Sequence, residues 1–167
     1  MAVADVGEGV LLEKPVSPGL CDTVKQYAGY FNVTTATKKY FYWFFESRSG
    51  VEESTPLVLW MTGGPGCSSG IALFNENGTN SQKYSAVTLY SNCNWALTFE
   101  IFFEGPCSVM MSGMSTKLNK YSWNTNASLI FIDQPAGTGF SYAEADSDYD
   151  HNEKGVSRDM YNFLQVL

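Results

Sequence analysis

Two short, uninterrupted apolar stretches constrain the fold of this chain more than any other feature. Residues 56–61 read PLVLWM and residues 129–132 read LIFI, and neither stretch alternates between apolar and polar residues. A strand with one face in water would alternate, whereas a strand covered on both faces is apolar throughout. Such strands are typical of parallel sheets that lie between two layers of helices. The two stretches therefore predict an α/β fold.

Two further strands and a helix are expected around this pair. Residues 27–33 and 39–47 are rich in aromatic and β-branched residues on either side of a polar linker, a pattern typical of a β-hairpin or two adjacent strands. Apolar residues recur at helical spacing over 156–167. Asp150 and Glu153 resemble a capping box at the start of that helix.

Composition excludes several classes of protein. The 167 residues suffice for one domain with its own core. The net charge is −7 and Lys and Arg form no cluster, which argues against a nucleic-acid partner. No apolar run approaches the roughly 20 residues of a membrane-spanning helix, so no membrane partner is expected. The cysteines are too few and too widely spaced for a zinc ribbon, and we expect no metal or other cofactor. Residues 1–15 lack the pattern of a signal peptide.

The segment LWMTGGPGCSSG at residues 59–70 ends the first apolar strand with a group of glycines. It lies at the carboxyl end of a predicted parallel strand, where α/β proteins place their ligand sites. No lysine stands where a phosphate-binding loop needs one. Two interpretations stay open from the residues alone. The segment is a tight turn, because Gly-Pro-Gly favours turns, or an oxyanion hole, because adjacent glycines let backbone N–H groups approach a developing negative charge.

The same segment closely resembles the pattern LWLNGGPGCSS of the serine carboxypeptidase family. Four flanking blocks resemble that family in the same order: CDTVKQYAGYFNV, YFYWFFESR, YSWNTNASLIFIDQPAGTGFSY and GVSRDMYNFL. The resemblance covers most of the chain and is to the amino-terminal third of a family member. It implies an α/β-hydrolase-type sheet flanked by helices, here incomplete, with residues 1–167 as the amino-terminal part of a single domain.

The resemblance also implies roles for individual residues. Gly64 would donate its backbone N–H to the oxyanion, while the N–H of Gly63 and the side chain of Thr62 would hold the terminal carboxylate of the substrate. Thr62 stands where the family has asparagine, so a hydroxyl replaces an amide donor. Trp60 takes the place of a tryptophan in the substrate pocket. Glu76 takes the place of a glutamate that pairs with a second carboxyl, which raises one pKa and favours an acidic working pH.

The cysteine and serines of the glycine segment, and Glu76 after it, are predicted to have roles other than catalysis. Cys67 matches a family cysteine whose disulfide partner lies much later in the chain, so its partner is expected to be absent here. Ser68 and Ser69 are not expected to be the nucleophile. Without the resemblance, Glu76 is interpreted as a solvated helix residue.

The catalytic serine, aspartate and histidine of the family are expected to be absent from this chain. No segment resembles the family's GESYAG. Ser141 lies in GFSYA, but Pro135 and Gly137 separate it from the preceding strand, whereas a nucleophile elbow follows its strand directly. We therefore interpret Ser141 and Asp133 as structural, and His151, the only histidine, as a solvated residue near the helix start.

Residues 79–104 interrupt the family pattern. Joining the flanking segments 75–78 and 105–109 restores a family-like stretch. We expect a non-family insertion at 79–104, either a translated intron or a true surface loop, which a fold tolerates at modest entropic cost. If the insertion is a translated intron, Cys93 and the sequon at Asn77 are accidental features of it.

The resemblance implies a serine-type carboxypeptidase that binds a peptide's carboxy-terminus and releases its last residue through an acyl-enzyme. The chain alone is expected to be inactive. Two alternatives stay open: an acyltransferase on the same scaffold, and a non-catalytic binding or interaction fragment. Family and sequons together imply the secretory pathway, with the vacuole, lysosome or cell exterior as destination. Asn32 and Asn126 are the glycosylation candidates.

Overall fold

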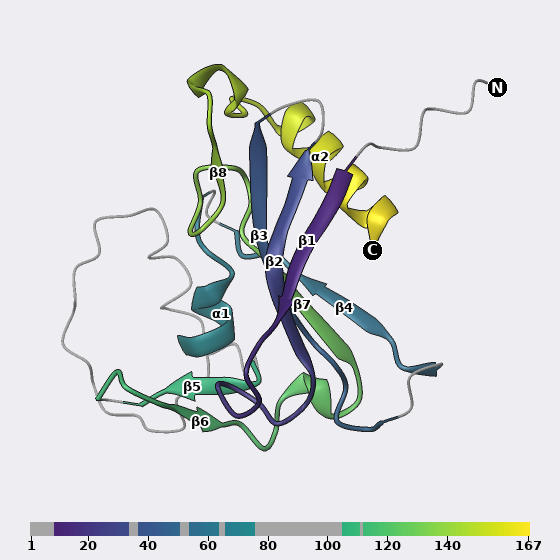
Figure 1. Ribbon diagram of the computed structural model, residues 1–167, viewed down its shortest axis with the longest axis vertical. Coiled ribbons are helices and arrows are strands. Elements are labelled where there is room, and N and C mark those ends of the chain that lie inside the picture. The colour runs from purple at the N-terminus through teal and green to yellow at the C-terminus, as the bar shows by residue number, and fades with distance from the viewer. Residues whose placement is uncertain (1–8, 34–36, 51–53, 64–65, 76–104, 111) are drawn as a thin grey trace.

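The chain forms one main sheet with a helix on each face. The structure is a computed structural model that describes residues 9–33, 37–50, 54–63, 66–75, 105–110 and 112–167 (Figure 1). Gly64, Glu76, Asn77 and the predicted insertion at 79–104 lie outside these residues. The strand order is β1-β2-β3-β7-β4, with β8 paired to β3. The strands are β1 (Gly9–Pro15), β2 (Gln26–Val33), β3 (Lys38–Phe45), β4 (Leu57–Trp60), β7 (Ser128–Ile132) and β8 (Tyr142–Ala143).

Shorter elements surround this sheet. Two of them form a separate antiparallel pair, β5 (Cys107–Val109) and β6 (Thr116–Leu118). The helices are α1 (Gly70–Asn75), α2 (Glu153–Val166) and the 3-10 helices η3 (Trp123–Thr125) and η4 (Asp146–Asp148). Among the described residues, no helix has the length and apolarity to cross a bilayer, and no group of His, Cys, Asp and Glu side chains could hold a metal ion.

The two apolar stretches form parallel strands, as predicted, and the structure shows that they pair with each other. β4 and β7 are parallel neighbours, with Leu57 opposite Ser128 and Trp60 opposite Phe131. The predicted aromatic hairpin is confirmed as well, because β2 and β3 pair antiparallel over most of their length. The other pairs of the sheet are also antiparallel, so parallel pairing is limited, within the described ranges, to β4 and β7.

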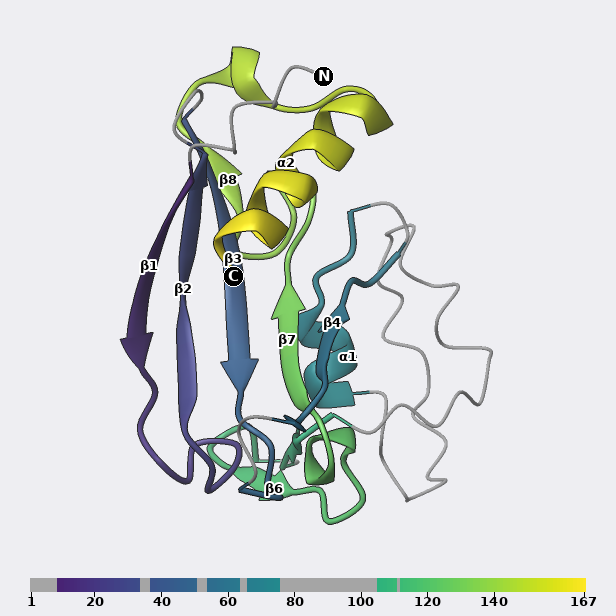
Figure 2. The same ribbon diagram turned by 90° about the vertical axis from the view of Figure 1, so that its right-hand side faces the viewer.

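The continuous apolar pattern of β7 reflects burial on both faces of the sheet. Ile130 and Ile132 belong to a core that also contains Met160 and Phe163 of α2. Leu129 and Phe131 point to the other face and belong to a second core with residues of α1. Figures 1 and 2 show α1 and α2 on opposite sides of the sheet. A strand between two layers cannot place polar side chains on either face without burying them.

A buried ion cluster attaches α2 to the start of β3. The Nζ of Lys38 lies 2.7 Å from Asp150 Oδ2 and 2.6 Å from Asp159 Oδ2, and all three side chains are buried. The hydroxyl of Tyr40 donates to Asp159 Oδ2 at 2.9 Å. Burial lowers the pKa of Lys38, but its hydrogen bonds to the two carboxylates outweigh this and raise the pKa above its ordinary value. The raised pKa favours the protonated form of Lys38 between the two aspartate side chains.

The same cluster corrects the predicted capping box. The N-cap of α2 is Asn152, whose side chain accepts a hydrogen bond from the N–H of Gly155 at 3.0 Å. Asp150 lies two residues earlier, and its carboxylate accepts instead from Lys38. The capping box predicted from the spacing of Asp150 and Glu153 is wrong because buried Lys38 binds the Asp150 carboxylate, which would otherwise cap the helix.

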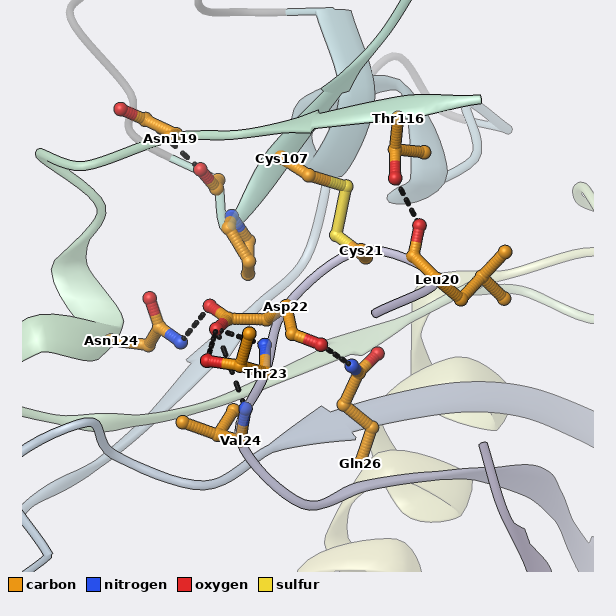
Figure 3. Close-up of a disulfide and its surroundings, with 12 residues drawn as sticks. Leu20, Cys21, Asp22, Thr23, Val24, Gln26, Cys107, Thr116, Asn119 and Asn124 are labelled. Carbon is orange, nitrogen blue, oxygen red and sulfur yellow. Dashed lines mark hydrogen bonds between the residues drawn. A yellow bond between two sulfur atoms is a disulfide. The ribbon is translucent and has the colours of Figure 1, made fainter. Parts of the chain in front are cut away.

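A disulfide and a buried carboxylate attach the segment before β2 to β5 and η3. Cys21 and Cys107 are bonded across 86 residues of sequence. Next to the disulfide, Asp22 Oδ2 accepts from Arg48 at 2.6 Å and from Asn124 Nδ2 at 2.8 Å, and Figure 3 shows Asn124 pointing inward at Asp22. Burial raises the pKa of Asp22, but the hydrogen bonds from Arg48, Asn124 and Thr23 outweigh it, so the pKa lies below its ordinary value.

Cys67 differs from its prediction. It is buried and disulfide-bonded. The expectation of a partner absent from the chain therefore does not match the structure.

Candidate functional site

The glycine segment and the segment after β7 meet at one edge of the sheet. β4 and β7 are parallel neighbours, so their carboxyl ends lie side by side. Thr62 and Gly63 follow β4, and Asp133 follows β7. Ligand sites of open α/β sheets lie at this edge. The topology thus brings together two segments that are far apart in the sequence.

The carboxylate of Asp133 ties these two segments together. Its Oδ1 accepts hydrogen bonds from the hydroxyl of Ser68 and from the backbone N–H of Ser69, each at 2.7 Å. Its Oδ2 accepts from the backbone N–H of Phe140 at 3.0 Å. Asp133 is only 2% exposed, and hydrogen bonds to a buried charged acceptor are among the stronger ones in proteins.

Ser69 adds a second link between the two strand ends. Its hydroxyl donates to the backbone oxygen of Ile132 at 2.6 Å and accepts from the backbone N–H of Thr62 at 3.0 Å. Ser68 also accepts from the N–H of Gly70 at 3.1 Å, at the start of α1. Neither hydroxyl is placed as an activated nucleophile, because each already donates its proton to a structural acceptor. The expectation for Ser68 and Ser69 agrees with this geometry.

Two glycines let the segments approach each other. Gly139 has φ +54°, and a Cβ on it would lie 2.1 Å from Asp133 Oδ2 and 2.9 Å from Ser68 Cβ. Gly66 has φ +86°, a conformation that other residues rarely adopt. The close contact at Gly139 allows the Phe140 N–H to reach the Asp133 carboxylate.

Gly63 is in a different situation. It is exposed, and a Cβ placed on it would meet no described atom within 4 Å. The neighbouring Thr62 is half-buried, and its Oγ1 accepts a hydrogen bond from the indole N–H of Trp60 at 3.2 Å. Because the indole nitrogen is a donor only, the Thr62 hydroxyl keeps its own proton for another acceptor. The arrangement offers a hydroxyl donor beside an uncovered stretch of backbone.

The predicted substrate tryptophan borders a cavity that is too small for a side chain. Trp60 packs edge-to-face against Trp123, with ring centroids 6.3 Å apart. These two rings and Phe131 help to line an apolar cavity of about 20 Å³, which is about the space that one water molecule occupies. The described residues therefore form no complete side-chain pocket at Trp60.

Trp60, Thr62 and Gly63 are neighbours in the sequence and lie at the carboxyl end of β4, and their roles in substrate binding stay predictions. Gly64 and Glu76 lie outside the described residues, so their predicted roles stay predictions. Ser141 is buried: its hydroxyl donates to the backbone oxygen of Asp133 at 2.6 Å and accepts from the Phe41 N–H at 2.7 Å. His151 is exposed. These positions agree with the structural interpretation of Ser141 and the solvated interpretation of His151.

Sequence reasoning missed how Ser68, Ser69 and Asp133 act together. A usable signal was present, because Asp133 directly follows a fully apolar strand, where a carboxylate has no reason to lie unless it accepts hydrogen bonds. The donors could not be identified from the sequence, since Ser68 and Asp133 are 65 positions apart.

Comparison with known proteins identifies the relatives of this chain. The serine carboxypeptidase family model matches residues 18–104 and 96–166. Serine carboxypeptidase 3 from Hordeum vulgare is 42% identical over 98% of this chain. Serine carboxypeptidase-like 49 from Arabidopsis thaliana is 37% identical over 96% of it, and carboxypeptidase Y homolog A from Phaeosphaeria nodorum is 39% identical over 92%. The chain spans 27%, 27% and 23% of the length of these three relatives. From the family model and these identities, the chain belongs to the serine carboxypeptidase family.

Proposed function

We propose that the protein to which this chain contributes is a serine-type carboxypeptidase that removes carboxy-terminal residues from peptides through an acyl-enzyme. The observation that carries the proposal is the exposed Gly63 next to the Thr62 hydroxyl, at the carboxyl end of β4. A peptide ending in a free carboxylate needs donors for that charge, and a backbone N–H with a neighbouring hydroxyl can supply two.

Each predicted residue has a distinct part in the proposed reaction. Gly63 and Thr62 hold the terminal carboxylate, and Trp60 orients the Thr62 hydroxyl by donating to its oxygen. Gly64 donates its N–H to the tetrahedral oxyanion, and Glu76 contributes a carboxyl to the carboxylate site. Removing one oxyanion donor typically costs about 10²–10³ in turnover. This chain matches only about a quarter of its relatives' length. We place the serine, aspartate and histidine of the triad in the remaining part of the full protein.

A chimera tests this proposal. Residues 18–166, with 79–104 removed, replace the matching part of the barley relative, and hydrolysis of blocked dipeptides is measured. We expect activity, and we expect Thr62→Val to raise KM for free-acid peptides, because losing a hydrogen bond to a charged group costs about 1.5–3 kcal/mol, or about 10–150-fold. Peptides with an amidated carboxy-terminus are the control and should not respond to Thr62→Val. An inactive chimera beside an active barley parent would contradict the proposal.

The isolated chain provides a second test. We expect it neither to hydrolyse blocked dipeptides nor to react with a serine-directed phosphonate, because Ser68, Ser69 and Ser141 all donate to structural acceptors. Stoichiometric labelling of one of these serines by the phosphonate would refute the assignment.

An acyltransferase is the second candidate, and Thr62 is the observation that favours it. An enzyme that transfers an acyl group to an alcohol has no terminal carboxylate to bind. Its affinity for substrate therefore falls less when a threonine hydroxyl replaces the asparagine amide at this position. The same chimera, supplied with an acyl ester and an alcohol acceptor, distinguishes the two activities by its product.

We propose further that residues 79–104 are an insertion foreign to the family fold. Gly105, which follows this segment, lies against α1, which precedes it: a Cβ on Gly105 would be 2.4 Å from the backbone oxygen of Leu73. The main spliced transcript tests the intron origin, since retention of the codons for 79–104 would refute it.

We also propose that the protein enters the secretory pathway. The disulfide between Cys21 and Cys107 supports this, because disulfides form and persist in oxidising compartments. Fractionation of the source cells, with the protein found in a vacuolar, lysosomal or extracellular fraction, is the expected result. A cytosolic protein with both thiols reduced would contradict it.

A further inference from the structure

Ser69 is held at a fixed point between the ends of β4 and β7. Its backbone N–H donates to Asp133 Oδ1 at 2.7 Å, and its backbone oxygen accepts from the N–H of Leu73 at 3.1 Å. Its hydroxyl donates to the backbone oxygen of Ile132 at 2.6 Å, and the residue is only 1% exposed. Three hydrogen bonds and burial together fix where this hydroxyl lies.

The same hydroxyl holds the backbone of Thr62. The N–H of Thr62 donates to Ser69 Oγ at 3.0 Å. The pairing of β4 with β7 ends at Trp60 and Phe131, so it does not extend to Thr62. Because the Ser69 hydroxyl bonds both to Thr62 and to Ile132 of β7, it keeps the chain attached to β7 two residues beyond the end of β4.

This attachment determines where the proposed donors for the substrate carboxylate lie. The Thr62 hydroxyl accepts from the indole N–H of Trp60 at 3.2 Å, while the backbone of Thr62 is bonded to Ser69. The N–H of Gly63 belongs to the peptide group that directly follows Thr62, so any shift of the Thr62 backbone also moves this donor. Gly63 itself is exposed. Donors in a binding site act only when they are held within about 0.5 Å of their productive geometry.

The neighbouring Ser68 provides a matched comparison. Its hydroxyl also donates to Asp133 Oδ1, at 2.7 Å, and it accepts from the N–H of Gly70 at 3.1 Å. Within the part of the chain that the structure describes, these bonds lead to Asp133 and to the start of α1 rather than to Thr62. Alanine at either position removes one hydroxyl from the same cluster, but only alanine at Ser69 releases the backbone of Thr62.

We propose that Ser69 is a positioning residue of the carboxylate site. It acts through Thr62, placing the Thr62 hydroxyl and the Gly63 N–H, and so sets the preference for peptides with a free carboxy-terminus over amidated ones. The inference rests on the proposed carboxypeptidase function and adds a residue that does not itself contact the substrate. Alanine in its place leaves the Thr62 N–H and the Ile132 oxygen without this partner, so the segment shifts to pair them elsewhere.

The chimera with the barley relative tests this role on blocked peptides with free and amidated carboxy-termini. Ser69→Ala should raise KM for free-acid peptides by about tenfold, which is less than the full effect of Thr62→Val, because the donors are displaced and not removed. KM for amidated peptides should stay nearly unchanged, and Ser68→Ala should leave the ratio of the two KM values unaltered. Combining Ser69→Ala with Thr62→Val should raise KM by less than the product of the single effects, since one residue acts through the other.

Two outcomes would overturn the positioning role while leaving the carboxypeptidase function intact. They are an unchanged KM for free-acid peptides in Ser69→Ala, and an equal loss on free-acid and amidated peptides. Where Ser69→Ala does not fold, Ser69→Cys makes the same comparison, because a thiol has nearly the size of the hydroxyl but bonds weakly.

Hydrogen exchange of the Thr62 amide, read by mass spectrometry on the same chimeras, tests the link without enzymatic activity. The amide should exchange about tenfold faster in Ser69→Ala than in Ser68→Ala, as expected for one lost hydrogen bond. In a chimera without activity, which contradicts the proposed function, this selective increase would still support the role of Ser69. Equal exchange rates in the two variants would overturn it.

Discussion

Deleting residues 79–104 should stabilise the isolated chain. α1 ends at Asn75, and Gly105 lies against it, because a Cβ on Gly105 would be 2.4 Å from the backbone oxygen of Leu73 and 3.0 Å from that of Ala72. The deletion leaves residues 76–78 to join these neighbours. Each residue of an extended chain spans about 3.5 Å, so three residues can bridge the short distance between the end of a helix and a segment packed on it.

The expected gain follows from the entropy of loop closure. Shortening the connection from residues 76–104 to 76–78 reduces its length about tenfold, which lowers the cost of closure by about 2 kcal/mol. The deletion also shortens the loop closed by Cys21 and Cys107 from 86 residues to about 60, which lowers the contribution of the disulfide by about 0.3 kcal/mol. The free energy of unfolding should therefore rise by about 1–2 kcal/mol.

Urea unfolding followed by tryptophan fluorescence measures this change. All chains carry Cys67→Ser and Cys93→Ser, so that they differ only in the connection. In a matched control, a Gly/Ser linker of equal length replaces 79–104. The linker variant should be as stable as the parent, and the deletion variant should unfold at a urea concentration higher by about 1 M, for a slope of 1–3 kcal/mol per molar. If linker and deletion each lower the free energy of unfolding by 2 kcal/mol or more, the segment is an integral part of the fold and the reasoning is wrong.

Four further predictions concern the described residues. Lys38→Met should lower the free energy of unfolding by about 3–5 kcal/mol, because it removes the buried cation between Asp150 and Asp159 and leaves Asp159 with only the exposed Arg158, 3.7 Å away, as a cation among the described residues. Lys25→Met, at the exposed pair with Glu46, should change it by less than about 1 kcal/mol. Because the pKa of Asp22 is lower in the folded chain than in the unfolded one, its stabilisation is complete above about pH 4 and declines as the pH falls through the folded pKa; Asp22→Asn should flatten this acid limb of a stability–pH profile. Replacing both Cys21 and Cys107 by serine should cost about 4–5 kcal/mol on the chain-entropy model, which thermal or urea unfolding can measure. Gly139→Ala should destabilise the chain by more than 2 kcal/mol because its Cβ would overlap Asp133, whereas Gly63→Ala should stay within about 0.5 kcal/mol; equal losses at the two positions would contradict the distinction between them.

The elements that were predictable are those whose local pattern matches their burial. β7 reads as an apolar run because both faces of the sheet are covered there, and α2 presents its apolar residues at helical spacing. β4 is equally apolar but is the last strand of the described order, and its side chains are half-buried or exposed. β1 was not predicted, since it is an edge strand with mostly exposed side chains and depends on pairing with β2. α1 was missed because its six residues are too short for a periodic signal.

The hydrogen bonds within the site were harder to predict from the sequence than the strands were. Hydrogen bonds from Ser68 and Ser69 to Asp133 exist only because β4 and β7 are parallel neighbours, and a crossover connection separates those strands in the sequence. A pattern within a short window cannot reveal such a pair. The prediction of Asp150 as the N-cap of α2 was wrong for a related reason. Lys38, which binds the Asp150 carboxylate, lies at the start of β3, far from Asp150 in the sequence.

The glycines of this region bear on whether the segment LWMTGGPGCSSG is only a tight turn or a binding segment. If the segment were only a turn, each glycine in it would be needed for its backbone angle or for a close neighbour. Gly66 meets the first condition with φ +86°, and Gly139 in the facing segment meets both. Gly63 meets neither, because its φ is not positive and a Cβ added to it would have no described atom within 4 Å. An exposed glycine that neither the turn nor the packing requires is what close approach of a ligand to the backbone requires. The uncovered backbone at Gly63 therefore favours a binding site over a simple turn.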